Sequence, residues 1–340
     1  MWYPRNLPRW AFLAAGAALG LGLAPLALAK PIDFVVAGAP RDLVADRDYL
    51  NLFTLLRQNG ITGFFPTFQY QEVPQARSYG YESDFVPPCS PNDRAFKALS
   101  SGIKLILPAE LVYPDPSIFS KPMSANDPLK QIIACAGRSN IAGISNYDEA
   151  AFQGVSLSDV KAFYDHVKAI DETLPVLMVH GPLVADRSEF NTSSKRRAYL
   201  DKVVEYSKSA DVVGFDVYPV PALVAKMGTP SSNGQIETSD KAIRDYAIWL
   251  KSALPGKRKL MVLQGFSYAD LYERNYLERN VPIDLRAVIQ APSRSELDVM
   301  VKQAQADGVD MIVWWGQAAL RTSHQPPWPD ILWLGRQYGH

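Results

Sequence analysis

The chain has 340 residues, of which 47% are hydrophobic, and 35 basic side chains balance 35 acidic ones. This apolar content is ample for a large buried core and excludes a disordered chain. The zero net charge, with no basic run interleaved with aromatic residues, gives no indication of a nucleic-acid partner.

The first 29 residues have the features of a secretory signal peptide. Arg5 and Arg9 precede an apolar stretch at positions 10–28, which ends in the small-x-small sequence Ala27-Leu28-Ala29. We therefore expect export to the periplasm or the medium, with a mature chain that begins near Lys30. The alternative is an uncleaved membrane anchor, because the apolar stretch is nearly long enough to cross a bilayer.

After the signal, short apolar runs alternate with segments whose apolar residues recur at helical spacing. Strands are expected at 34–37, 61–65, 104–107, 141–144, 176–179, 212–217, 259–263 and 311–315. Helices are expected at 46–58, 92–99, 127–136, 156–170, 194–207, 238–254, 293–306 and about 329–336.

This alternation predicts a single (β/α)8 barrel, the TIM barrel, over residues 30–340. A doubly wound open sheet would also alternate, but it requires a Gly-rich phosphate-binding turn after the first strand. The sequence Ala37-Gly38-Ala39-Pro40 is not such a turn.

Two cysteines are present, and export would permit a disulfide between them. Cys89 falls in the loop after the second strand, whereas Cys135 falls at the far end of the third helix. Because these places lie at opposite ends of a barrel, we expect two separate thiols.

In such a barrel the active site lies at the C-terminal ends of the strands. The polar and aromatic residues found there are Glu110, Tyr147, Asp148, Glu149, His180, Asp216, Tyr218, Gln264, Trp314, Trp315 and Gln317. Aromatic faces stack on sugars, amides and carboxylates bind hydroxyls, and a carboxylic acid can protonate a glycosidic oxygen. We therefore expect a carbohydrate ligand, with Glu149 and Asp216 as the catalytic candidates and the others as substrate-binding candidates. Of the two consecutive tryptophans, one should lie in the outer core.

The stretch NIAGISNYDEA, at 140–150, decides which carboxylate faces the barrel axis. A period of two places Ser145, Tyr147 and Glu149 on one face of the strand, and we expect that face to point inward. Asp148 would then turn toward a neighbouring strand or cap the following loop. The alternative is that Asp148 and Glu149 only bind backbone amides of a long loop.

Several short motifs together resemble secreted glycoside hydrolases with a TIM barrel. They are YDE at 147–149, GVS at 154–156, Ile-Asp at 170–171, Pro-Val at 175–176, GFDVYP at 214–219, VLQGF at 262–266 and WW at 314–315. The resemblance covers most of the mature chain and implies Glu149 as the general acid. Two residues depart from the pattern. Ala150 stands where proline is common, and Gln264 stands where retaining barrel hydrolases place their glutamate nucleophile.

Because an amide cannot act as that nucleophile, the mechanism stays open at this point. A carboxylate pair on strands four and seven could approach the roughly 5–5.5 Å of a retaining pair. Glu149 and Asp216, two strands and about 9.5 Å apart, suit the roughly 6.5–9.5 Å of an inverting pair. A third arrangement uses an assisting group on the substrate, oriented by Asp216, Tyr218 or Gln264. The rival function is a non-catalytic carbohydrate-binding barrel, in which Gln264 marks a lost nucleophile.

No metal and no cofactor are expected. The four histidines, His166, His180, His324 and His340, are not paired at metal-ligand spacing. The sequence QGFS after the seventh strand is also a poor match to a phosphate-binding loop.

Overall fold

The computed structural model describes residues 32–67, 71–73, 76–78, 83–271 and 281–339. The predicted signal peptide lies outside these ranges. Within them, no helix is both long enough and apolar enough to cross a membrane.

Eight parallel strands form a closed barrel in the order β1-β10-β9-β8-β7-β6-β5-β2. The first strand pairs with the last and with the second, so the sheet has no edge. The strands are β1 (Asp33–Ala37), β2 (Gly63–Phe65), β5 (Lys104–Pro108), β6 (Ile141–Ser145), β7 (Val176–His180), β8 (Val212–Val217), β9 (Arg258–Gln264) and β10 (Met311–Trp315). The predicted (β/α)8 barrel is confirmed.

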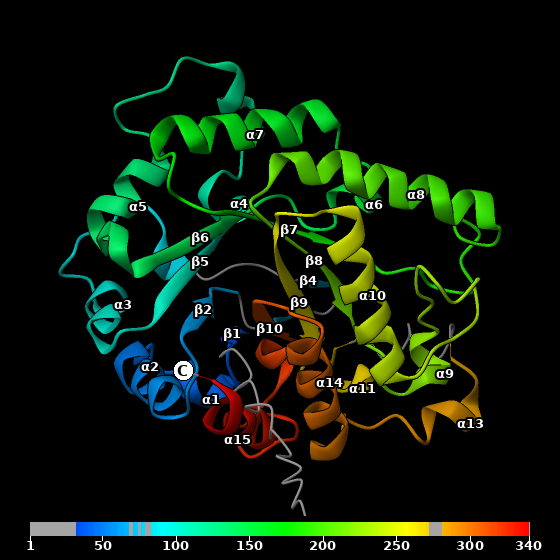
Figure 1. Ribbon diagram of the computed structural model, residues 1–340. Coiled ribbons are helices and arrows are strands. Elements are labelled where there is room, and N and C mark those ends of the chain that lie inside the picture. The colour runs from blue at the N-terminus through cyan, green and yellow to red at the C-terminus, as the bar shows by residue number, and fades with distance from the viewer. Residues whose placement is uncertain (1–31, 68–70, 74–75, 79–82, 272–280, 340) are drawn as a thin grey trace, which may run out of the picture.

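A ring of helices surrounds the barrel (Figure 1). The longer helices are α2 (Tyr49–Gln58), α5 (Pro128–Ala136), α7 (Leu157–Ile170), α8 (Ser193–Tyr206), α10 (Ser239–Ala253), α14 (Arg294–Ala306) and α15 (Trp328–Tyr338). Short helices are α1 (Arg41–Val44), α3 (Arg94–Lys97), α4 (Ala109–Val112), α6 (Ala150–Gln153), α9 (Ala222–Ala225), α11 (Tyr268–Leu271) and α13 (Ile283–Arg286). A small antiparallel hairpin pairs β3 (Gln71–Val73) with β4 (Ala76–Ser78).

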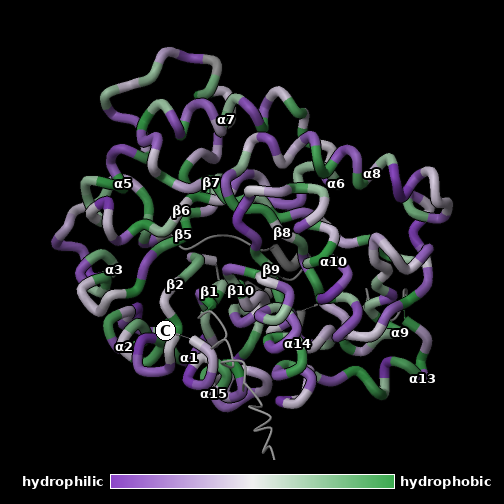
Figure 2. Tube along the Cα trace, in the orientation of Figure 1, coloured by the Kyte–Doolittle hydropathy of each residue, from purple (hydrophilic) through white to green (hydrophobic). Residues whose placement is uncertain are grey.

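Two apolar layers hold the fold together. The larger layer lies between the strands and the helices, and the smaller one fills the barrel interior. Along β8, for example, Phe215 packs in the larger layer while Val212 packs inside the barrel, as a period of two requires. The helices change between hydrophilic and hydrophobic residues along their length (Figure 2), because each buries only one face.

Cys89 and Cys135 form a disulfide, with their Cα atoms 6.1 Å apart. The prediction of two separate thiols is therefore wrong. The chain after β2 does not stay above the barrel rim. Phe85 is fully buried in the outer layer, 5.0 Å from Tyr49 and 6.1 Å from Phe64 between ring centroids, which brings the following residues down to α5.

Candidate active site

The end of β6 determines where the acidic residues point. The strand ends at Ser145, and the Asn146 side chain then accepts a hydrogen bond from the Tyr147 N–H (2.8 Å) and donates one to the Val160 carbonyl (3.3 Å). Glu149 adopts a left-handed backbone conformation (φ 43°, ψ 36°) immediately before α6. For a residue other than glycine this conformation is uncommon and is found preferentially at functional sites.

Because the chain leaves the strand at Ser145, strand alternation does not continue through the acidic residues. Tyr147 turns outward and packs against Phe163, with ring centroids 5.9 Å apart. Asp148 faces the barrel interior, and Glu149 turns sideways toward β8. The predicted common inward face of Ser145, Tyr147 and Glu149 is therefore wrong for Tyr147 and Glu149, and Asp148 takes the inward place.

The carboxyl group of Glu149 hydrogen-bonds to that of Asp216, across the end of β7. Gly181 makes this crossing possible, because a Cβ atom there would lie 2.8 Å from Oε1 of Glu149. The Tyr199 hydroxyl donates to the Gly181 carbonyl (2.7 Å) and holds this backbone in place. The separation expected from strand spacing is therefore wrong, because it measured the backbones and not the ends of the side chains.

Asp216 is the more deeply buried member of this carboxyl pair, with 8% of its surface exposed. Burial raises its pKa well above the usual range, and the charges of Glu149 and Asp148 raise it further. The Tyr218 hydroxyl donates to its Oδ1 (3.0 Å), which opposes the shift only in part.

Burial also raises the pKa of Glu149, but three contacts favour its charged form. These are the hydrogen bond from Asp216, the positive charge of Arg187 and a hydrogen bond from Gln153 Nε2 (3.3 Å). The pair therefore retains one proton at a pH where two separate carboxyl groups would both be ionised.

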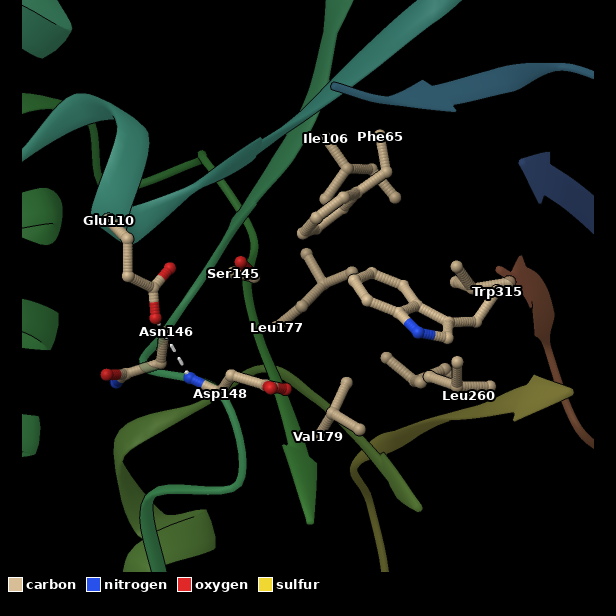
Figure 3. Close-up of a pocket in the computed structure, with 12 residues that line it drawn as sticks. Phe65, Ile106, Glu110, Ser145, Asn146, Asp148, Leu177, Val179, Leu260 and Trp315 are labelled. Atoms are coloured by element: carbon tan, nitrogen blue, oxygen red, sulfur yellow. Dashed lines mark hydrogen bonds between the residues drawn. The ribbon is translucent and has the colours of Figure 1, made fainter. Parts of the chain in front are cut away.

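Asp148 lies at the mouth of a small cavity on the barrel axis, which we call the axial pocket (Figure 3). Its backbone N–H donates to Oε1 of Glu110 (3.1 Å), which comes from α4. Solvent reaches Asp148, but the barrel walls surround its carboxylate, so desolvation together with the charges of Glu149 and Glu110 raises its pKa to about 7.

The rest of the axial pocket is mostly apolar and has a volume of about 50 Å³. The Trp315 indole extends into it from β10, and its ring meets Phe65 edge to face at 6.3 Å. Leu177 and Val179 from β7 and Leu260 from β9 complete the labelled apolar lining (Figure 3).

A larger cavity of about 460 Å³, which we call the lateral cavity, lies beside the carboxyl pair. Its lining comes from the loops after β6, β7, β8 and β9 and includes Glu149, Phe152, Arg187, Tyr218, Met227 and Tyr268. Glu149 thus borders the lateral cavity, whereas Asp148 borders the axial pocket. The Tyr268 hydroxyl donates to the Tyr218 carbonyl (2.7 Å) and ties two of the lining loops together.

Gln264 does not line either cavity. Its side chain is fully buried, with Oε1 accepting from the Val220 N–H (2.9 Å) and Nε2 donating to the carbonyls of Val220 (2.6 Å) and Phe266 (3.1 Å). An ionised glutamate could not make the two donated bonds. The structure thus places Gln264, expected to bind substrate, in the support of the loop after β8.

Three other predicted site residues are also fully buried away from both cavities. His180 contacts Ser207 through Nε2 (3.0 Å), and burial lowers its pKa to about 3. Trp314 stacks on Phe34 in the outer layer, as expected for one of the two tryptophans. Gln317 donates to the Gly265 carbonyl (3.2 Å) and supports the loop after β9.

Sequence reasoning missed Gly181, Phe152 and Arg187. The dipeptide His180-Gly181 at the end of a predicted strand was a usable signal, because glycine permits close approach of another group. Nothing in the sequence around Phe152 or Arg187 indicated that two separate loops bring them to one cavity.

No family model matches the chain, and no curated protein matches it in sequence. Solved structures do share its fold. It is similar to the Bacillus cereus spore cortex-lytic enzyme SleL (TM-score 0.51, 10% identity, covering 92% of this chain and 76% of SleL). It is also similar to a Bacteroides thetaiotaomicron protein assigned as an alpha-L-fucosidase (TM-score 0.55, 10% identity, covering 97% and 99%). At this identity the similarity establishes a shared barrel fold.

The raised pKa of Asp148 gives a prediction that needs no ligand. Its ordinary value is 3.8 and its value here is about 7, so the folded protein binds a proton that the unfolded chain releases between these limits. The free energy of unfolding should therefore fall as pH rises through this window. Asp148→Asn removes this loss, so the variant should gain stability relative to the native chain between pH 4 and pH 8.

Urea unfolding of both proteins across that pH range measures the difference. Thr54→Ala on the exposed face of α2 serves as the control, because it changes no titratable group and its effect on stability should be the same at all pH values in that range. A difference between Asp148→Asn and the native chain that does not grow with pH would contradict the raised pKa.

Proposed function

We propose that this protein is an exported glycoside hydrolase in which Glu149 delivers a proton to the glycosidic oxygen. The observation that carries the proposal is the hydrogen-bonded carboxyl pair of Glu149 and Asp216 in the wall of a cavity large enough for a saccharide. The shared barrel fold of SleL supports it at the level of fold.

The two carboxyl groups have different roles because they lie at different depths. Glu149 borders the lateral cavity and can reach a bound glycosidic oxygen, whereas Asp216 is buried behind it. Asp216 holds the shared proton and passes it to Glu149 as the bond to the leaving group lengthens. The positive charge that develops on the sugar compensates the two carboxylates that remain.

Asp148 is suited to stabilise that positive charge, since it faces the axial pocket and stands next to the proton donor in sequence. Trp315 lines the same pocket and offers a flat apolar surface to the edge of a bound sugar. Asp216 is in direct contact with Glu149, closer than the separations of either a retaining or an inverting pair, so we assign it to proton storage rather than to activating water.

The alternative function is a barrel that binds carbohydrate without cleaving it. It was suggested by Gln264, which stands where a nucleophile would have been lost. In the structure Gln264 uses its amide to hold the loop after β8, so its identity carries no weight against catalysis. A binding protein also has no need of two carboxyl groups that repel each other, whereas an acid catalyst does.

Glu149→Gln tests the acid role, because it keeps the shape and removes the proton. Once a screen of polysaccharides and aryl glycosides has found a substrate, the variant should lose about 10²–10⁴ in rate with an ordinary alcohol leaving group. It should lose far less with a dinitrophenyl leaving group, which departs without protonation. Glu172→Gln, an exposed change distant from the site, is the matched control.

Equal losses of rate on both leaving groups would remove Glu149 from the acid role. Undiminished rates on both would remove it from the chemistry altogether.

Gly181→Ala tests whether contact between the carboxyl groups matters. The added methyl group would lie 2.8 Å from Glu149 Oε1, and the bond from Tyr199 prevents the backbone from retreating. Displacing the carboxyl by about 1 Å should lower kcat/KM by about a hundredfold. Gly228→Ala is the control, since its added methyl finds no atom nearer than 3.4 Å, and its kcat/KM should match the native value. Full activity of Gly181→Ala would contradict the proposed pair.

Export is the second part of the proposal. It is supported by the signal-like first 29 residues and by the disulfide, since disulfides persist mainly in oxidising compartments. Intact-mass measurement of protein recovered from periplasm or medium should give a chain that begins near Lys30. Recovery of a chain that retains Met1 would favour a membrane anchor instead.

A further inference from the structure

The lateral cavity has a composition that the proposed acid chemistry does not use. Part of its lining is apolar and includes Phe152, Val224 and Met227. The lining also carries charged residues, which are Arg187 and the pair Asp186 and Lys226, all from the loops after β7 and β8.

The charges of this second group do not cancel. Lys226 Nζ lies 2.5 Å from Asp186 Oδ2, so these two side chains neutralise each other. Arg187 has no ion pair among the residues that the structure describes. Its guanidinium carbon lies 4.7 Å from the centre of the Phe152 ring, and the side chain is otherwise exposed to the cavity.

This stacking on Phe152 restrains the guanidinium plane and leaves its N–H groups available to a ligand. A guanidinium binds a carboxylate through two parallel hydrogen bonds, which a neutral hydroxyl cannot match. Glu149 lines the same cavity and shares a proton with Asp216, which reduces its repulsion of an anion.

We propose that the lateral cavity binds a saccharide unit that carries a carboxylate, as a uronic or sialic acid does, and that Arg187 is the residue that recognises this carboxylate. That the ligand is a saccharide rests on the proposed function. That it carries a carboxylate rests on the positive charge of Arg187, which has no ion pair among the described residues, and on the apolar residues beside it. A guanidinium fork also pairs with tetrahedral oxyanions, so sulfated glycans are the comparison that tests the assignment to a carboxylate.

Direct binding tests this inference without any turnover. A glycan array that presents uronic-acid, sialic-acid, sulfated and matched neutral glycans is probed first with the native protein. The strongest carboxylated glycan and its methyl ester, which has the same shape without the charge, are then titrated by calorimetry. The native protein should bind the acid at least tenfold more tightly than the ester, and added NaCl should narrow the difference.

Variants assign the effect to one side chain. Arg187→Gln should weaken binding of the acid by about tenfold to a hundredfold and leave binding of the ester unchanged. Arg187→Lys keeps the positive charge but lacks the guanidinium fork, so its affinity for the acid should lie between those of the native protein and Arg187→Gln. Arg197→Gln, the same change on the exposed face of α8, should bind as the native protein does.

Binding to neutral or sulfated glycans alone, binding to none of the array, or an Arg187→Gln variant with native affinity for the acid would each overturn the inference. Hydrolysis of neutral glycans without any effect of Arg187 would leave the proposed function intact while this inference fails. Preference for the acid without hydrolysis of any glycan would support this inference while the proposed function fails.

Discussion

Two carboxyl groups in hydrogen-bond contact are the arrangement on which the rest of this site depends. A pair of buried acids repel each other when both are ionised, so the pair retains a proton at a pH where isolated carboxyl groups would have lost theirs. Contact between Glu149 and Asp216 requires three local features at once. These are the left-handed backbone at Glu149, the absence of a side chain at Gly181 and the inward register of Asp216 on β8. Each feature belongs to a different strand end, and only the closed barrel brings the three together.

The barrel supplies the electrostatic environment as well as the positions. Its interior is filled by apolar side chains up to the level of Ser145, so the carboxyl groups lie directly above a region of low polarity. These apolar surroundings disfavour the ionised form of a carboxyl group. Desolvation is therefore the largest cause of the raised pKa at Asp148, Glu149 and Asp216. Holding these acids together is unfavourable, and the packing of the surrounding apolar layers offsets this free energy. A rigid scaffold commonly stabilises a strained site in this way.

The fold could be predicted from the sequence because its signal is repeated. Eight apolar runs, each followed by a helical pattern, specify the same architecture many times over, and an error in one element would not change it. The carboxylates at the strand ends could also be found, because a parallel barrel brings all such ends to one rim. The orientation of individual side chains could not. Strand alternation holds only while the chain remains in the strand, and the sequence 145–149 leaves β6 at Ser145.

The same limit explains the errors at Gln264 and Cys89. Position alone suggested that Gln264 faces a ligand, yet its amide can satisfy a backbone donor and two backbone acceptors, and a loop with unpaired groups competes for it. The course of the chain around Cys89 was determined by Phe85, which enters the outer apolar layer and takes the loop with it. In both cases a backbone or packing requirement outside the site decided where the side chain went. A motif therefore identifies the residues that can do chemistry, and the competition for buried hydrogen bonds and apolar surface determines which of them are free to do it.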